Sequence, residues 1–228
     1  MSQNLLKRIF TSIILISILF LVNFSHQYVF VFAILIVGTL VCIEANNLFL
    51  KLLIIKSKNK YFLKKINFKF LILNIITFSY IFLIFCNFSL EIHKYESPFF
   101  FIFIICICFF TDIGGYVFGK IIGGKKLSKI SPNKTISGTI GSFVFSIFPL
   151  ILISNLNYLD LALNLKNIIF CFLISLISQL GDLFISFIKR KAKVKDTGNM
   201  LPGHGGILDR VDGIIFAVPF SYFLIKLI

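Results

Sequence analysis

The sequence predicts an all-α, polytopic membrane protein with about seven transmembrane helices, within a range of roughly six to nine. Hydrophobic residues make up 58% of the 228 residues and charged residues only 14%, whereas about a quarter of a soluble domain is charged. The mean hydropathy is +0.98. Long apolar runs recur along the chain, and roughly 20 apolar residues cross a bilayer as a helix. Because these runs do not alternate with polar residues, they favour helices over the strands of a membrane barrel.

The apolar runs place the expected spans at 9–24, 28–48, 70–88, 98–119, 138–153, 167–188 and 207–225. The first run follows Lys7 and Arg8, as in a secretory signal peptide, but no small-x-small cleavage site comes after it. We therefore expect a retained first helix. All five Cys lie inside apolar runs without the paired spacing of metal ligands, which favours small buried apolar side chains.

The basic residues predict the orientation of these spans. With the N-terminus in the cytoplasm, 20 of the 23 Lys and Arg fall on the cytoplasmic side, mainly in the loops 49–69, 120–137 and 189–206. Such an imbalance sets the orientation of a membrane protein. The net charge of +14 then faces anionic lipid headgroups, so we expect membrane lipid as a partner and no nucleic acid.

Residues that carry chemistry concentrate in the second half of the chain. Thirteen of the 14 Gly lie from Gly114 onward, and of the six Asp only Asp160 falls on the expected outer side. We interpret the chain as one integral membrane domain, 1–228, in which 1–105 form scaffold helices and 106–228 form the catalytic helices and cytoplasmic loops.

The sixth expected span carries a polar face. Asp182, Ser186 and Arg190 follow one another at intervals of four residues, with Lys189 beside them, so they share one side of a helix. A carboxylate at membrane depth needs a cation, a basic partner or a water-filled cavity. Asp182 is therefore a candidate functional residue, and a structural ion pair between helices is the alternative.

The last expected span begins with a glycine-rich segment, and Asp209 and Asp212 follow it on one helix face. Glycines before a helix let backbone N–H groups approach an anion, so Gly205 and Gly206 are candidate substrate-binding residues. His204 lies between two glycines, which favours a phosphate-contacting or proton-handling role. Carboxylates such as Asp209 are the hard oxygen ligands that Mg²⁺ takes.

The fourth expected span ends in Asp112 and a Gly115-xxx-Gly119 pattern that lets a neighbouring helix approach closely. The adjoining glycines and Lys120 mimic a Walker A loop, but Ile121 replaces its Ser or Thr and the segment is a membrane helix. The next loop presents two hydroxyls and a cation, on Ser131, Thr135 and Lys134. This is a weak phosphate-binding signal, with a plain solvated loop as the alternative.

Together these residues resemble the phosphatidate cytidylyltransferase (CDP-diacylglycerol synthase) family. The family signature runs from Ser-x-apolar-Lys-Arg, through Lys-Asp and a small residue, to His-Gly-Gly-apolar-x-Asp-Arg-apolar-Asp. The positions that meet it here are Ser186, Ile188, Lys189, Arg190, Lys195, Asp196, Gly198, Leu201, Pro202, His204, Gly205, Gly206, Ile207, Asp209, Arg210, Val211 and Asp212. The resemblance covers about residues 111–213. It departs at Ile136 and Ser137, where the family often has Trp followed by Glu or Gln.

The resemblance implies an enzyme that joins CTP and phosphatidic acid to give CDP-diacylglycerol and pyrophosphate. It implies that Asp182 and Asp209 hold Mg²⁺, and that Asp212 completes the site or orients Arg210. Lys189, Arg190 and Arg210 would neutralise phosphate charge. Ser186 would contact a phosphate or a second, monovalent cation such as K⁺.

Family members also suggest a homodimer in the bacterial inner membrane, with the active site facing the cytoplasm. Two alternatives remain. One is a CTP-dependent polyprenol or phytol kinase, which shares parts of this organisation. The other is a transporter or channel, for which the internal repeats and unwound midplane helices are missing from the sequence.

Overall fold

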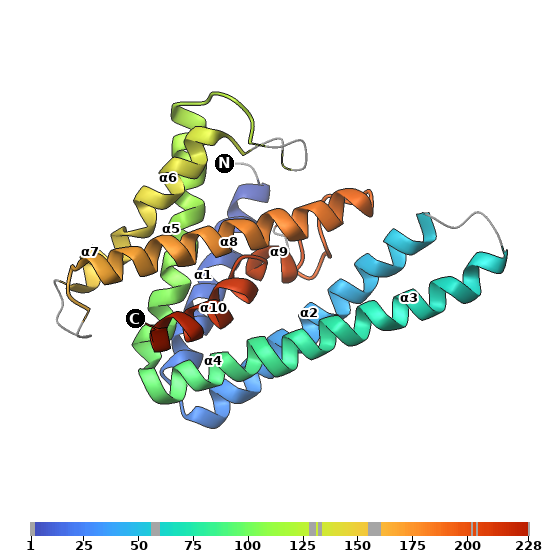
Figure 1. The fold of residues 1–228 in the computed structure, drawn as a ribbon, viewed down its shortest axis with the longest axis horizontal. Helices are drawn as coiled ribbons and strands as arrows, with labels where there is room; N and C mark the ends of the chain where they lie inside the picture. The colour runs from blue at the N-terminus through green and yellow to red at the C-terminus, as the bar shows by residue number, and fades with distance from the viewer. Residues whose placement is uncertain are drawn as a thin grey trace. The chain divides into compact units, whose positions relative to one another are not determined.

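The computed structural model describes residues 3–55, 60–127, 131, 134–154, 161–201, 203 and 205–227, of which 3–9, 55 and 60–67 are described by backbone only. Within these ranges every regular element is a helix, joined by loops that contain two isolated β-bridges. Figure 1 shows the elements in chain order. The prediction of an all-α, polytopic membrane protein is confirmed.

The elements have the following bounds: α1 Gln3–Asn23, α2 Gln27–Ile55, α3 Lys60–Ser79, the π-helical η1 Tyr80–Cys86, α4 Asn87–Glu91, the π-helical η2 Ile92–Glu96, α5 Pro98–Ile121, α6 Ile136–Ser146, α7 Phe148–Ser154, α8 Leu165–Lys191, α9 Leu208–Val211 and α10 Ile214–Leu227. The segments α3, η1, α4 and η2 follow one another without a break and differ only in how tightly the backbone winds.

Five described helical segments are long and apolar enough to cross a membrane: Gln27–Ile54, Phe68–Glu96, Pro98–Ile121, Ile136–Ser154 and Leu165–Lys191. Each corresponds to one expected span. The first expected span appears as the shorter apolar helix Phe10–Asn23. The seventh is interrupted, because α9 ends at Val211 and α10 begins at Ile214 with only 14 residues.

The chain divides into two compact units, Met1–Leu90 with Ile188–Val211 and Glu91–Phe187 with Asp212–Ile228. The chain passes from one unit to the other within α4, within α8 and after α9. This division does not follow the expected change of role near residue 105. The interpretation as one domain with scaffold and catalytic parts remains a prediction.

In the first unit, α2 contacts α1, α3, η1 and α9. Figure 1 shows α2 and α3 running alongside each other as a long helical hairpin. Phe30, Val41 and Phe85 are almost fully buried in this unit. Between membrane helices such side chains stabilise the structure by van der Waals packing, because lipid is as apolar as the protein interior.

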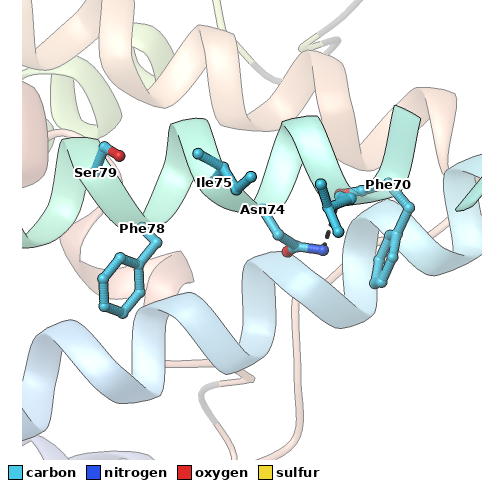
Figure 2. A pocket seen from close by; sticks show the side chains of 6 residues that line it. Phe70, Asn74, Ile75, Phe78 and Ser79 are labelled. Atoms are coloured by element: carbon cyan, nitrogen blue, oxygen red, sulfur yellow. Dashed lines mark hydrogen bonds between the residues drawn. The ribbon is translucent and has the colours of Figure 1, made fainter. Parts of the chain in front are cut away.

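A hollow of about 600 Å³ lies along α3 in the first unit. Figure 2 shows its lining, which comes from successive turns of this one helix. Asn74 uses its amide to donate to the carbonyl of Phe70, 3.0 Å away, and the other lining residues are apolar except Ser79. The hollow contains no titratable side chain, so it does not provide a site for phosphate chemistry.

In the second unit, α5 contacts α6, α7, η2 and α10. Its N-terminus is capped by Ser97, whose hydroxyl accepts from the N–H of Phe100 at 3.0 Å, and Pro98 occupies the first turn. Both features are typical of helix starts. Phe103, Ile104 and Ile107 of α5 are buried, which makes this helix the centre of the unit.

Glycines bring α5 and α6 into backbone contact. A Cβ added at Gly141 would clash with the side chain of Phe118 and with the carbonyl oxygen of Gly114, and one added at Gly138 would clash with the carbonyl of Gly115. The predicted close approach at Gly115-xxx-Gly119 is confirmed, because Gly119 also faces Gly138. The fit of small residues in a membrane helix pair is the usual basis of such packing.

Candidate functional site

A polar cavity of about 250 Å³ lies in the second unit, between α5 and the segment that leads into α6. It brings Asp112 together with Ser131, Lys134 and Thr135, the residues that the sequence analysis selected in the following loop. The other lining residues are Gly115, Tyr116, Gly138, Thr139, Ser142 and Gln179. The structure thus favours a built pocket over a plain solvated loop for this segment.

Backbone pairing holds the cavity loop in place. The N–H of Leu127 donates to the carbonyl of Lys134 at 2.8 Å, and the N–H of Ile136 donates to the carbonyl of Lys125 at 3.0 Å. Thr135 caps α6, since its hydroxyl accepts from the N–H of Gly138 at 3.1 Å. Ser137, one of the two residues that depart from the family pattern, donates to the carbonyl of Gly123. Its role here is to tie the two ends of the loop together.

Lys134 forms an ion pair with Asp182 of α8. Ser186, one turn further along α8, donates to Asp182 Oδ1 at 3.4 Å. The side chains of Lys134 and Asp182 are 27% and 24% exposed, so neither is sealed from a ligand. The basic partner that an intramembrane Asp182 requires is therefore present in the second unit, from the cavity loop.

A buried chain of hydroxyls and one amide continues from the cavity into the second unit. Gln179 Nε2 donates to Ser175 Oγ at 3.2 Å, and Thr111 Oγ1 donates to the same oxygen at 3.0 Å. Ser142 Oγ donates to the carbonyl of Thr111 at 2.8 Å. Gln179 and Ser142 line the cavity, and sequence reasoning missed both. The signal was present, because Gln179 precedes Asp182 by three residues and shares its helix face.

The carboxylate of Asp209 is the centre of a second polar cluster, in the first unit. Asp209 Oδ1 accepts from Lys189 Nζ at 2.8 Å, and Oδ2 accepts from the N–H groups of Thr197 at 2.8 Å and Gly206 at 3.0 Å. The Lys189 and Asp209 side chains are only 10% and 7% exposed. Burial acts to raise the pKa of Asp209, but the hydrogen bonds from Lys189, Thr197 and Gly206 outweigh it, and the pKa lies below its ordinary value. Asp209 is therefore an anion at neutral pH.

Glu44, in the middle of α2, accepts hydrogen bonds from Thr197 and from the segment that begins α9. Its Oε2 accepts from the hydroxyl of Thr197 at 2.8 Å and from the N–H of Leu208 at 2.9 Å, and its Oε1 accepts from the N–H of Ile207 at 3.0 Å. Sequence reasoning missed Glu44. It is a carboxylate inside an expected span, and the rule that selected Asp182 applies equally to it.

The backbone N–H groups of Gly205 and Gly206 are both used within the loop, and the expected role of these glycines in substrate binding remains a prediction. The N–H of Gly205 donates to the carbonyl of Leu201 at 3.2 Å, and that of Gly206 donates to Asp209. Gly205 has a φ of +87°, a conformation that favours glycine. A Cβ at Gly206 would clash with Thr197 and Glu44. These glycines let the loop pack tightly, and His204 lies outside the described residues.

The remaining basic candidates lie around the C-terminal end of α8. Arg190 and Arg210 are exposed, and Arg190 donates to the carbonyl of Val194 at 3.4 Å. The helix ends in a Schellman-type turn, in which Val194 N–H donates to the carbonyl of Lys189 and Lys193 N–H to that of Arg190. Lys193 occupies the left-handed position with a φ of +53°. The turn directs the chain back toward Thr197 and Asp209.

Asp212 lies outside the helix that carries Asp209. The sequence placed both on one face of a continuous helix, but α9 ends at Val211 and Asp212 occupies the turn that follows. Asp212 Oδ1 accepts from the N–H of Gly213 at 2.9 Å. Gly213 packs against Ser178 of α8, where a Cβ would clash with the serine hydroxyl. The close contact of Gly213 with Ser178 and the hydrogen bond to Asp212 thus stabilise the interruption between α9 and α10.

Among the described residues, no group of three or more His, Cys, Asp or Glu side chains forms a metal-binding cluster. The carboxylates Asp182 and Asp209 each belong to a lysine pair instead. This arrangement differs from a dedicated all-protein metal cage.

The fold and these two clusters define an all-α, multi-pass membrane protein in which Lys134 and Lys189 each pair with an aspartate. Residues 45–228 match the model of the cytidylyltransferase family. The chain belongs to the cytidylyltransferase family, which confirms the predicted resemblance.

Several curated proteins named phosphatidate cytidylyltransferase are similar to this chain. The protein of Bacillus subtilis (strain 168) is 44% identical over 129 residues, which cover 56% of this chain and 48% of that protein. The protein of Brucella suis biovar 1 is 38% identical over 138 residues, covering 59% and 50%. That of Rickettsia bellii is 42% identical over 132 residues, covering 52% and 54%. The chain spans about half the length of the curated relatives it matches.

Proposed function

We propose that the protein is a phosphatidate cytidylyltransferase, which converts CTP and phosphatidic acid to CDP-diacylglycerol and pyrophosphate for membrane phospholipid synthesis. Its family and the names of its relatives support the reaction class. The observation that carries the proposal is that a lysine lies against a carboxylate at two places, as Lys134–Asp182 and Lys189–Asp209. Each pair offers a cation for a phosphate and an anion for a metal ion.

In this reaction a phosphate oxygen of phosphatidic acid attacks the α-phosphorus of CTP. One P–O bond forms, the bond to the bridging oxygen breaks, and pyrophosphate leaves with the electron pair of that bond. Both reactants are anions that repel each other, so catalysis depends on positioning and charge neutralisation. No side chain needs to form a covalent intermediate.

The cations of the site would supply this neutralisation. Lys134 lines the cavity and Lys189 contacts Asp209, so both can exchange a carboxylate for a phosphate oxygen. Arg190 and Arg210 are exposed and would bind phosphate by bidentate contacts that Lys does not make. Ser131, Thr135 and Asp112 line the same cavity as Lys134. Their hydroxyls and carboxylate would orient the substrate that enters it.

The donors present fit a divalent cation. Asp182 is partly exposed and contacts the ammonium of Lys134 and the hydroxyl of Ser186. Asp209 is held as an anion by three donors. We propose that Asp182 and Asp209 are Mg²⁺ ligands, as the family resemblance implies, and that Ser186 contacts a phosphate or a monovalent cation. The ion would bind phosphate oxygens of the substrates and offset the charge that develops during transfer.

The setting of the reaction is part of the same proposal. The distribution of Lys and Arg supports a cytoplasmic N-terminus and a cytoplasmic active site, in the inner membrane of a bacterium. Phosphatidic acid would enter from the leaflet and CTP from the cytoplasm. A homodimer is proposed on family resemblance alone.

Labelled CTP tests the function directly. The purified protein in detergent, given phosphatidic acid, Mg²⁺ and CTP labelled at the α-phosphate, should release pyrophosphate and transfer the label to lipid. The same mixture with γ-labelled CTP should leave the lipid unlabelled. Transfer of the γ-label instead would show a lipid kinase and exclude cytidylyl transfer.

A further inference from the structure

Glu44 lies one residue before the segment that matches the family model, yet it contacts the most polar loop of the chain. The residue is only 2% exposed. Both carboxylate oxygens are used, one by Ile207 and the other by Thr197 and Leu208. The donors are 153 to 164 residues away in the sequence, so the contact fastens α2 to the loop before α9.

The loop around Glu44 is shaped to the carboxylate. A Cβ at Gly198 would lie 2.7 Å from Glu44 Oε1, and one at Gly206 would clash with Oε2. A carboxylate buried on an apolar helix is costly unless its acceptor sites are filled. Here three donors fill them. Loss of the Glu44 carboxylate would leave these loop donors without their acceptor, and loss of the loop would leave the carboxylate buried without them.

Glu44 and Asp209 hold the same short segments by adjacent donors. Thr197 gives its backbone N–H to Asp209 and its hydroxyl to Glu44. Gly206 gives its N–H to Asp209, and the next two N–H groups go to Glu44. A displacement of the Glu44 carboxylate would therefore move both backbone donors that orient Asp209 Oδ2.

We propose that Glu44 is a positioning residue, which acts through Thr197 and residues 206–208 to fix the carboxylate of Asp209. This inference rests on the proposed function, in which Asp209 binds the metal ion and Glu44 itself touches neither substrate nor metal. Residues that orient metal-binding side chains typically contribute about 10–100-fold to affinity or activity. Glu44 belongs to this class.

The test compares Glu44→Gln and Glu44→Ala with Glu96→Gln, the same chemical change at an exposed glutamate outside the site. The glutamine variant keeps the shape and loses the bond to one donor, whereas alanine loses all three. We expect kcat to fall about tenfold in Glu44→Gln and about 100-fold in Glu44→Ala. The Mg²⁺ concentration for half-maximal rate should rise in the same order, with KM for phosphatidic acid changed less than about twofold. A merely structural role would lower the yield of folded enzyme without changing these constants per folded molecule.

Limited trypsin digestion in detergent gives a readout that does not depend on turnover. Lys191, Lys193 and Lys195 are exposed next to the anchored loop, and Lys94 and Lys166 are exposed elsewhere. We expect Glu44→Ala to speed cleavage at the first three sites and not at the last two, with Glu96→Gln like the wild type. Unchanged cleavage and kcat, or equal acceleration at all five sites, would overturn the proposal. If the wild type does not transfer cytidylyl groups at all, the proposed function fails, and the digestion alone decides whether Glu44 holds the loop.

Discussion

At the residue scale, Asp182 and Asp209 are both paired with lysine but differ in their surroundings. Asp182 is about a quarter exposed, and its contacts include the side chains of Lys134 and Ser186. Asp209 is nearly buried and is also held by two backbone N–H groups. Removal of one partner of a buried pair costs about 3–5 kcal/mol, and exposed pairs contribute less. Lys189 therefore has a larger structural role than Lys134, whose side chain can turn to a ligand at lower cost.

Replacement of Lys134 should weaken substrate binding rather than folding. We expect Lys134→Ala to lower kcat/KM for CTP by about 10–100-fold, because one charge-assisted hydrogen bond contributes about 1.5–3 kcal/mol. Steady-state kinetics measure this, with thermal unfolding as a check on the fold. Lys126→Ala, an exposed lysine of the same loop, serves as the control. Equal kinetics in both variants would show that Lys134 does not contact phosphate.

Sequence reasoning found the charged residues of the site but not the partners of its backbone donors. Lys134, Asp182 and Asp209 stand out because charged residues are rare and costly beside apolar runs. The fate of the Gly205 and Gly206 N–H groups depends on Leu201 and Asp209. The sequence near Gly205 and Gly206 does not indicate which oxygen atoms will accept hydrogen bonds from their N–H groups.

At the element scale, the pairing of α5 with α6 positions the cavity. Gly114 and Gly141 bring the two backbones together, so Asp112 on α5 and Thr135 at the start of α6 line the same hollow. The Gly-xxx-Gly spacing predicted a close neighbour for α5, and it could not say which helix that would be. Helix α9 was not predicted as a separate element, because apolar residues continue on both sides of Asp212 and Gly213.

A methyl group at the α5–α6 contact should loosen it. In Gly141→Ala the new Cβ would meet Phe118 and the backbone of Gly114, and overpacking of this kind costs about 1–3 kcal/mol. We expect a lower unfolding temperature in detergent and a parallel loss of activity. Ile140→Ala, at a neighbouring residue that is 59% exposed, should change the unfolding temperature little. A Gly141→Ala protein as stable as the wild type would contradict the packing.

At the scale of the whole molecule, composition and apolar run length were sufficient for the fold class and for most spans. Five spans and the short helix Phe10–Asn23 occur where the sequence places them. The division into two compact units was not foreseen, because it depends on contacts between segments as distant as Glu44 and Thr197. Hydropathy carries no information about such pairing.

The orientation in the membrane can be measured by labelling. In a protein whose five native cysteines are replaced, Lys126→Cys should react with a membrane-impermeant maleimide only after the inner membrane is permeabilised. Lys94→Cys should react in intact spheroplasts. Both positions are exposed, so access to reagent depends on the side of the membrane. The reverse pattern would place the proposed site on the outer face and would remove its access to CTP.

The central claim is that Asp182 and Asp209 both serve one metal-dependent transfer. Its most direct measurement is the rate of lipid labelling from α-labelled CTP as a function of Mg²⁺ in Asp182→Asn, Asp209→Asn and Asp160→Asn. We expect the first two variants to insert in the membrane and to lose at least about 1,000-fold in rate. Asp160→Asn, at the aspartate expected on the outer side, should keep the wild-type rate. Mg²⁺-dependent labelling at near wild-type rate in either of the first two variants would contradict the claim.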